Sequence, residues 1–204
     1  MTSESLPEIH IVRHGETAWT KSRRYTGLSD IPLTERGEQQ ARQLGKYLEG
    51  GAYKHVFTSP LQRASRTCEL AGFGGRAQID PDLVEWNYGE YDGLTSEEIR
   101  KLRPSWHVFR DGCPGGESVA EVAARADRVV RRLRELNATV LLFSSGHFTR
   151  VFAARWLGLE PSCGRLFMLS TTTLSILGYE HTTSEPAIRL WNDVRPGEDR
   201  KTEE

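Results

Sequence analysis

Short apolar runs alternate along this chain with longer segments in which apolar residues recur every three or four positions. Short runs of this kind are typical of buried strands. They predict strands at residues 9–12, 55–58, 140–144, 173–177 and 187–191. The longer segments are typical of amphipathic helices. Strands that alternate with helices predict an α/β fold, namely a three-layer α/β/α sandwich with a mostly parallel central sheet.

Capping residues locate the starts of the helices. Thr34 is expected to cap a helix, with Leu33 packed against its first turn and one apolar face made by Ala41, Leu44 and Leu48. Ser59 is expected to cap the next helix, with Pro60 in the first turn. Three further helices are predicted from Thr95 to before Pro104, along the stripe Val119, Val122, Ala126, Val129 and Leu133, and after Gly146.

Length and composition limit the classes of protein to which the chain can belong. Its 204 residues suit one domain, expected over residues 1–194, followed by a polar tail at 195–204. A formal net charge of −1 gives no overall field that would attract nucleic acid. Because the chain shows no basic leader and no apolar run of about 18 residues, we expect a cytoplasmic protein without a membrane partner. Association into a homo-oligomer stays open.

The three cysteines add little to the chemistry that the chain can perform. Cys68, Cys113 and Cys163 are widely spaced and form no C-x-x-C pair. An odd number of cysteines in this arrangement predicts neither a disulfide framework nor a zinc site. We therefore expect a protein of a reducing compartment that holds no metal.

The first predicted strand runs directly into Arg13, His14 and Gly15. Because ligands of open α/β sheets bind at the carboxyl ends of the strands, this order places a cation and a nucleophile at a binding edge. Arg13 can hold two phosphoryl oxygens through its planar guanidinium, and Gly15 lets backbone N–H groups approach the remaining charge. The tripeptide alone also suits an ordinary exit from a strand, so a phosphate site depends on the segments that accompany it.

Two charged residues further along the chain fit such a site. Arg63 falls in the first turn of a predicted helix, where the helix dipole favours an anion, although a solvated helix arginine would look the same. Glu85 lies in an aromatic-rich loop with Trp86 and Tyr88, and such a loop can desolvate a carboxylate for general-acid chemistry. Taken alone, Glu85 is equally an ordinary loop residue.

Two short polar segments complete the set. Thr26 and Gly27 offer a hydroxyl and an unhindered amide close in sequence to the first motif, although the pair alone is typical of a turn. The strand at 140–144 ends in a serine pair followed by Gly146 and His147, again at the ligand-binding edge. A lone histidine in that place is as well explained by structure as by catalysis.

Together these segments resemble the histidine phosphatase superfamily, also called the phosphoglycerate mutase-like family, over roughly residues 9–191. The resemblance implies the phosphoglycerate mutase-like fold. It implies that His14 accepts the phosphoryl group, with catalytic partners at Arg13, Arg63 and Glu85. It places substrate-binding residues at Gly15, Thr20, Thr26, Gly27, Tyr88, Gly146 and His147. Thr20 stands where many members carry an asparagine.

One departure from the family's pattern falls inside the chemistry. Members carry a second catalytic histidine immediately before the glycine of an x-His-Gly segment, and this chain has Ser145 there. His147 follows the glycine, so its ring should point elsewhere. Losing this donor without compensation is expected to lower turnover roughly 10²- to 10³-fold. An engineered substitution, a naturally slow enzyme and a binding protein all fit this serine.

The resemblance implies a phosphatase without metal or cofactor that hydrolyses a small phosphate ester through a phosphohistidine on His14. Residues 25–28, 85–89 and 109–113 are similar to sugar-phosphate phosphatases of the sedoheptulose-bisphosphatase type and to broad acid phosphatases. A phosphoglycerate mutase-type phosphotransferase is the first alternative, although mutases carry a water-excluding insertion after the glutamate that this chain lacks. A catalytically weak phosphate-ester binding protein is the second alternative.

A bisphosphate substrate would need a second cationic pocket. Lys21, Arg23 and Arg24 are candidates because they lie close in sequence to the first motif. The same three residues would also form a solvated basic loop, so their role stays open.

Overall fold

The computed structural model describes residues 6–194, and the predicted tail at 195–204 lies outside the described residues. Its centre is a six-stranded sheet in the order β3-β2-β4-β1-β5-β6. The strands are β1 (Ile9–Arg13), β2 (His55–Thr58), β3 (Gln78–Ile79), β4 (Val140–Ser144), β5 (Leu174–Tyr179) and β6 (Pro186–Asp193). Strands β3, β2, β4 and β1 are parallel, whereas β5 and β6 pair antiparallel. The predicted mostly parallel sheet is confirmed.

Seven α-helices connect these strands within residues 6–194. They are α1 (Ala18–Lys21), α2 (Glu35–Leu48), α3 (Gln62–Leu70), α4 (Ser96–Leu102), α5 (Val108–Asp111), α6 (Val119–Leu136) and α7 (Gly146–Trp156). Thr34 caps α2 by accepting from the N–H of Gly37, and Thr95 caps α4 in a reciprocal bond with Glu98, as predicted. The two four-residue helices, α1 and α5, were not predicted because a single turn has no periodicity to detect.

The start of α3 differs from the prediction. The helix begins at Gln62 rather than after Ser59, and its N-cap residue Leu61 makes no side-chain cap. The N–H of Gln62 instead donates to Oδ1 of Asp30 at 2.7 Å, while the hydroxyl of Ser59 accepts from Leu61 at 3.3 Å. A carboxylate from a distant loop thus takes the cap position, and Arg63 remains in the first turn as expected.

Helices cover both faces of the sheet because the strand residues alternate between two apolar cores. Ile11 and Leu142 face the core that contains α6 and α7, whereas Val12 and Phe143 face the core beneath α2 and α3. Four of the five residues in the predicted α6 stripe are buried, and Val119 at the helix start is only partly buried. The three-layer arrangement is therefore the one that the apolar pattern predicts.

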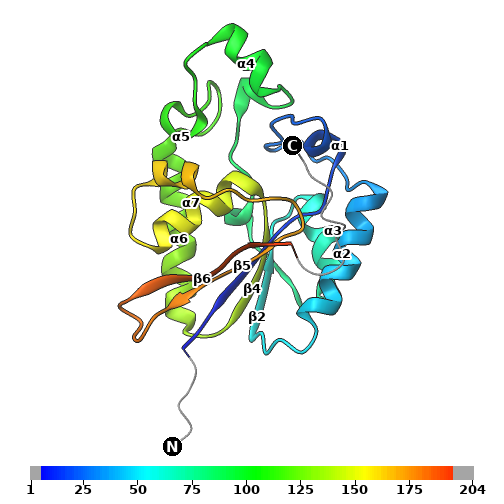
Figure 1. Ribbon diagram of the computed structural model, residues 1–204, viewed down its shortest axis with the longest axis vertical. Coiled ribbons are helices and arrows are strands. Elements are labelled where there is room, and N and C mark those ends of the chain that lie inside the picture. The colour runs from blue at the N-terminus through cyan, green and yellow to red at the C-terminus, as the bar shows by residue number, and fades with distance from the viewer. Residues whose placement is uncertain (1–5, 195–204) are drawn as a thin grey trace, which may run out of the picture.

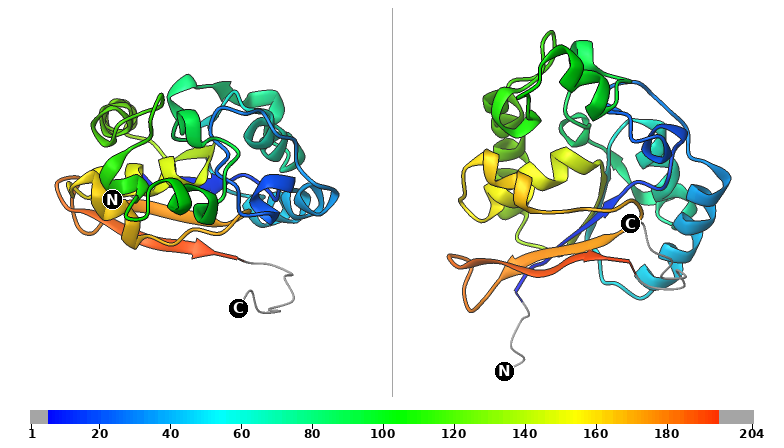
Figure 2. Two further views of the ribbon diagram at one scale, coloured as in Figure 1. Left: turned by 90° about the horizontal axis from the view of Figure 1, so that it is seen from above. Right: turned by 45° about the horizontal axis from the view of Figure 1, so that its top comes forward.

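Residues 89–113, which we call the cap, extend beyond the carboxyl ends of the strands and carry α4 and α5 (Figures 1 and 2). Tyr25 is held to the cap by two backbone hydrogen bonds, from its N–H to Leu94 and from Gly93 to its carbonyl, each 2.8 Å long. Tyr91 and Trp106 anchor the cap in the core beside α6. The cap therefore forms a wall above the ends of β1 and β4.

Candidate active site

A cavity of about 420 Å³ opens at the carboxyl ends of β1 and β4, where ligands bind in folds of this class. Its lining combines the end of β1, the loop after α1, the Glu85 loop, the start of α7 and the segment before β5. The lining residues are Arg13, His14, Thr20, Arg23, Arg24, Tyr25, Thr26, Glu85, Tyr88, Ser96, Gly146, His147, Arg150, Met168 and Leu169. Eight of the twelve predicted site residues are in this set, while Gly15, Gly27, Arg63 and Ser145 are not.

Arg13 is the last residue of β1, and its guanidinium lies across the floor of the cavity. One of its amino groups donates to the carbonyl of Leu169. Its Nε is buried and has no partner among residues 6–194. A Cβ on Gly146 would lie 3.1 Å from Nε and Cζ of Arg13, so only glycine lets α7 approach this closely without a shift. The Nε–H of Arg13 is therefore a buried donor that makes no bond within the described chain.

His14 follows Arg13 and is 2 % exposed. Its Nδ1 lies 2.8 Å from the carbonyl of Gly15, and because a carbonyl only accepts, Nδ1 carries the proton. Burial, followed by the nearby cations of Arg63 and Arg13, lowers the pKa of His14 well below its usual value. The imidazole is therefore neutral near pH 7, and Nε2 is the nitrogen with a free lone pair.

Gly15 supports His14 from outside the cavity. A Cβ on Gly15 would lie 2.7 Å from the carbonyl oxygen of Gly37 in the first turn of α2. The N–H of Gly15 donates to the hydroxyl of Thr67 at 3.0 Å, and this hydroxyl donates to the carbonyl of Arg63 at 2.6 Å. Its amide is therefore used within the protein, and its role here is to let the loop pack against α2.

Arg63 is fully buried and lies beside His14 without lining the cavity. Its two amino groups donate to three carbonyls of the loop after α1, those of Thr26, Gly27 and Ser29, at 2.7 to 3.1 Å. Its Nε is buried and has no partner among the described residues. Arg63 thus shapes the loop with one side of its guanidinium and leaves one N–H for an anion.

Helix α1 and the loop after it contain three predicted site residues, Thr20 in the helix and Thr26 and Gly27 in the loop. Thr26 lines the cavity, and its hydroxyl donates to the carbonyl of Arg24 at 3.2 Å. The amide of Gly27, expected to be open to a ligand, donates instead to Oδ1 of Asp92 at 2.8 Å. The Thr20 side chain lines the cavity, but its hydroxyl donates to the carbonyl of Thr17 and accepts from the N–H of Thr17.

Glu85 lines the cavity opposite Arg13, and three backbone N–H groups orient its carboxylate. Oε1 accepts from Trp86 and Phe148, each at 2.8 Å, and Oε2 accepts from His147 at 3.0 Å. The aromatic neighbours predicted from the sequence are buried beside it, but the three donors left no signal in the sequence. Because two donors belong to the first turn of α7, the carboxylate fixes the Glu85 loop to that helix.

Arg125 on α6 holds the loop that carries Glu85 from behind. It donates to the carbonyls of Asp82, Val84 and Glu85 at 2.7 to 3.2 Å. Its Nε and Nη2 also bind both carboxylate oxygens of Glu117, at 2.9 and 2.7 Å. Sequence reasoning missed this residue, because an arginine inside a helical segment reads as an exposed charge.

Ser145 is the N-cap residue of α7 and is fully buried. Its hydroxyl makes no cap bond and has no partner among residues 6–194. It adjoins Gly146, which packs on the guanidinium of Arg13. A buried hydroxyl without a partner is costly, so this one also suits a ligand that is absent from the free protein.

His147 lines the cavity, but aromatic side chains hold its ring. Its Nδ1 is hydrogen-bonded to the hydroxyl of Tyr88 at 2.5 Å, and its ring stacks on Tyr25 at a centroid distance of 5.7 Å. Burial, followed by the cations of Arg150 and Arg13, lowers the pKa of His147 well below its usual value. It is therefore a neutral wall residue at the position where substrate contact was predicted.

The structure adds cavity residues that sequence reasoning missed or left open. Arg150, one turn into α7, was not singled out, and it lines the cavity together with Ser96 of the cap. Of the basic loop, Arg23 and Arg24 reach the lining and Lys21 does not. Arg150 lies three residues after His147, and Ser96 follows the predicted helix cap Thr95, but an arginine and a serine inside helical segments carry no pattern that indicates a cavity.

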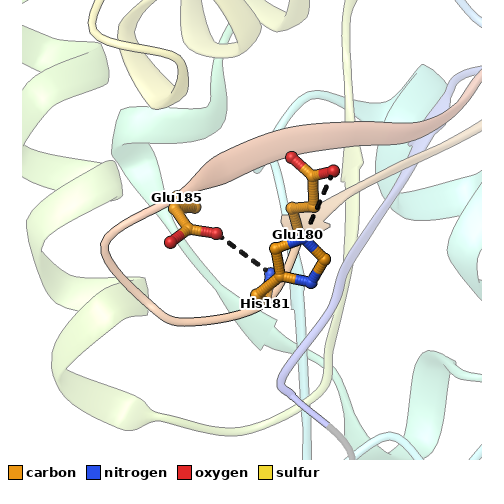
Figure 3. A group of neighbouring side chains, drawn as sticks. All are labelled: Glu180, His181 and Glu185. Atoms are coloured by element: carbon orange, nitrogen blue, oxygen red, sulfur yellow. Dashed lines mark hydrogen bonds and ion pairs between the residues drawn. The ribbon is translucent and has the colours of Figure 1, made fainter.

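One group of side chains in the described part of the chain has the composition of a metal site. Glu180, His181 and Glu185 offer ligand atoms within 4.8 Å of one another (Figure 3). All three are exposed at the turn between β5 and β6, and none lines the cavity. Within residues 6–194 no helix combines the length and apolar character needed to span a membrane.

Known proteins share both the sequence pattern and the fold. A family model described as the histidine phosphatase superfamily (branch 1) matches residues 9–194. An acid phosphatase of Mycobacterium tuberculosis is 39% identical over 182 residues, which cover 87% of this chain and 89% of that protein. The sedoheptulose 1,7-bisphosphatase of Saccharomyces cerevisiae is 37% identical over 185 residues, covering 75% and 68%. A solved open-reading-frame product of Mycobacterium tuberculosis superimposes with a TM-score of 0.86 and 37% identity, covering 92% and 97%.

Proposed function

We propose, because this chain belongs to the histidine phosphatase superfamily, that it hydrolyses a small phosphate monoester through a phosphohistidine on His14. The observation that carries the proposal is the state of His14, whose Nδ1 proton is held by the carbonyl of Gly15, so that the neutral ring keeps a free lone pair on Nε2. Relatives named as an acid phosphatase and a sedoheptulose 1,7-bisphosphatase support phosphatase activity. A sugar phosphate or bisphosphate is the substrate class that we favour.

In the first step, Nε2 of His14 attacks phosphorus in line with the leaving oxygen, so that a P–N bond forms while the P–O bond breaks. The unpartnered Nε groups of Arg13 and Arg63 are the donors for the equatorial oxygens. Glu85 transfers a proton to the leaving alkoxide, which then departs as an alcohol.

In the second step, water attacks the phosphohistidine and the P–N bond breaks. Glu85, now ionised, accepts the proton of that water, so the same carboxylate serves as acid and then as base. The chain lacks the water-excluding insertion that mutases carry after this glutamate, which favours hydrolysis over transfer to a second substrate. Hydrolysis therefore ranks above the mutase reaction.

A weakly catalytic binding protein is the second candidate, and Ser145 is the observation that favours it. Its unpartnered hydroxyl is a donor for a phosphoryl oxygen, but unlike an imidazole it cannot carry a positive charge. A chain with this serine would keep its affinity for the ester while losing much of its rate.

Acid-quench labelling with a ³²P-labelled sugar phosphate tests the proposal. We expect label on the native chain and none on His14→Ala, together with loss of hydrolysis. The control is His10→Asn, which changes a histidine that is on β1, the strand that leads to His14, and that lies outside the cavity lining. Label retained by His14→Ala would overturn the nucleophile assignment, and an unlabelled native chain that still binds the ester would favour the binding protein.

A further inference from the structure

A smaller cavity lies next to the one at His14, beneath the cap. This second cavity has a volume of about 120 Å³. Tyr25, Ser96, His147 and Arg150 line both cavities, so the two adjoin each other. The volume equals that of about four water molecules in the liquid, enough for one phosphate or carboxylate group.

The walls of the smaller cavity carry positive charge without a compensating carboxylate. Arg100 and Arg150 line it, and no aspartate or glutamate does. Arg100 lies in the last turn of α4, and no side-chain partner of its guanidinium is found within residues 6–194. The three remaining ionisable neighbours, Tyr25, His107 and His147, are uncharged near neutral pH, because the pKa of Tyr25 is raised and the pKa values of both histidines are lowered.

Arg150 is held in place with part of its guanidinium still available. Its Nε and Nη2 each donate, at 3.0 Å, to the carbonyls of Gly164 and Arg165, and its Cζ lies 4.6 Å from the ring centre of Phe109. Its Nη1 makes no hydrogen bond within the described chain. A preorganised arginine with one free donor suits recognition of an anion.

Positive charge around the smaller cavity also affects the pKa of His107, which lines it. Its pKa is lowered by burial and then by the cations of Arg110, Arg150 and Arg165, while Asp111 opposes them. Asp111 is itself paired with Arg110 at 2.8 Å. Of these three cations, Arg150 is the one that also lines the smaller cavity.

We propose that the smaller cavity binds a second anionic group, a phosphate or a carboxylate, carried by the same substrate whose phosphoryl group is attacked by His14. Arg150 and Arg100 hold this group, and His107 contacts it from the cap. The inference rests on the proposed function and narrows its substrate to monoesters with a second anion. Arg100 and Arg150 thus take the role of second cationic pocket for which Lys21 and Arg24 were candidates. Lys21 lines neither cavity, and Arg24 already donates to the carbonyl of Gly93 and the carboxylate of Glu98.

Calorimetric titration of the full chain tests the subsite without requiring turnover. The probes are fructose 1,6-bisphosphate, 3-phosphoglycerate and p-nitrophenyl phosphate, which carry a second phosphate, a carboxylate and neither group. We expect the native chain to bind one of the first two at least roughly tenfold more tightly than the third, and Arg100→Ala to remove that preference. Lys21→Ala, the matched control on the basic loop, should keep it.

The outcomes separate this inference from the proposed function. A preference that survives in both Arg100→Ala and Arg150→Lys, or that is lost in Lys21→Ala, overturns the subsite. Absence of any preference in a chain that hydrolyses p-nitrophenyl phosphate through His14 overturns the subsite and leaves the hydrolase intact. A preference that depends on Arg100 in a chain that forms no phosphohistidine supports the subsite and refutes the hydrolase.

Discussion

The two ends of the region formed by the adjoining cavities are built in different ways. At the inner end, around His14, backbone groups fix the polar side chains: Gly15 holds His14, three carbonyls hold Arg63, and three N–H groups hold Glu85. At the outer end, Arg23 and Arg100 have no side-chain partners among the described residues. The inner end is preorganised for one chemical step, whereas the outer end has charges free to select the ester.

Glu85→Gln is expected to have the largest effect, and it tests whether the inner end performs chemistry. General acid catalysis contributes roughly 10²- to 10⁴-fold, so kcat for an alkyl phosphate should fall by that factor. For p-nitrophenyl phosphate, whose leaving group needs little protonation, we expect a loss under about tenfold. Steady-state kinetics on both esters gives the two ratios.

The matched control is Glu90→Gln, which changes an exposed carboxylate on the same loop that does not line the cavity. Its kinetics should equal those of the native chain. Equal losses for the two esters in Glu85→Gln would mean that Glu85 only positions the ligand.

Ser145→His is expected to have the next largest effect, in the opposite direction. A restored imidazole adds a donor at the transferring phosphoryl group, so kcat should rise roughly 10²-fold while the Kd for phosphate moves less than about tenfold. Thr149→Val is the control, because its hydroxyl is also buried without a partner one turn further along α7. An unchanged kcat on an ester that binds would mean that the inner end is already complete, or is not catalytic.

The fold could be predicted because its signals are local. Alternating apolar residues located five of the six strands, and Thr34 and Thr95 located two helix starts. The failures share one cause, which is contact between distant segments. Asp30 caps α3 from 32 positions away, and β3 forms only by pairing with β2. No pattern within a short window contains such contacts.

The same division applies to the candidate site. His14 could be found because one strand and its exit loop contain the motif. The roles of Arg63 and Gly27 could not be read, because their hydrogen bonds to Ser29 and Asp92 depend on how two loops meet. Arg150 and the cavity-lining cap residues Ser96 and Arg100 were not singled out, although the cap helix that begins after Thr95 was predicted. The sequence thus predicted the inner end, where the ends of strands place the side chains. It did not predict the outer end, where the side chains meet only when the cap packs against the rest of the fold.

A third prediction asks how far the rigidity of the inner end depends on Arg125. Arg125→Met removes a buried partner of Glu117 and three donors behind the Glu85 loop. We expect a loss of about 3 kcal/mol or more in the free energy of unfolding, since breaking a buried ion pair leaves a charge uncompensated. Arg128→Met, which breaks an exposed pair with Asp82 from the same helix, should cost under about 1 kcal/mol. Equal costs, measured by urea denaturation, would contradict the positioning role.

The smallest effect concerns His14 and His147, the two histidines whose pKa values are lowered well below the usual value, chiefly by burial. Their folded-state pKa lies below the usual value of 6.5, so below pH 6.5 the unfolded chain binds more protons than the folded one. Stability is therefore unaffected above that pH and falls as the pH drops below it, by at most about 1.4 kcal/mol per pH unit for each histidine.

Urea denaturation between about pH 5.0 and 6.5, where most carboxylates stay ionised, measures this slope. In His14→Asn, which removes one buried titrating group, the slope should be shallower by up to about 1.4 kcal/mol per pH unit. His107→Asn, at the exposed outer end, should change the slope less, because water remains available to its charged form. If the outer histidine proved to have the larger influence, the distinction between a dry, preorganised inner end and a solvated outer end would be wrong.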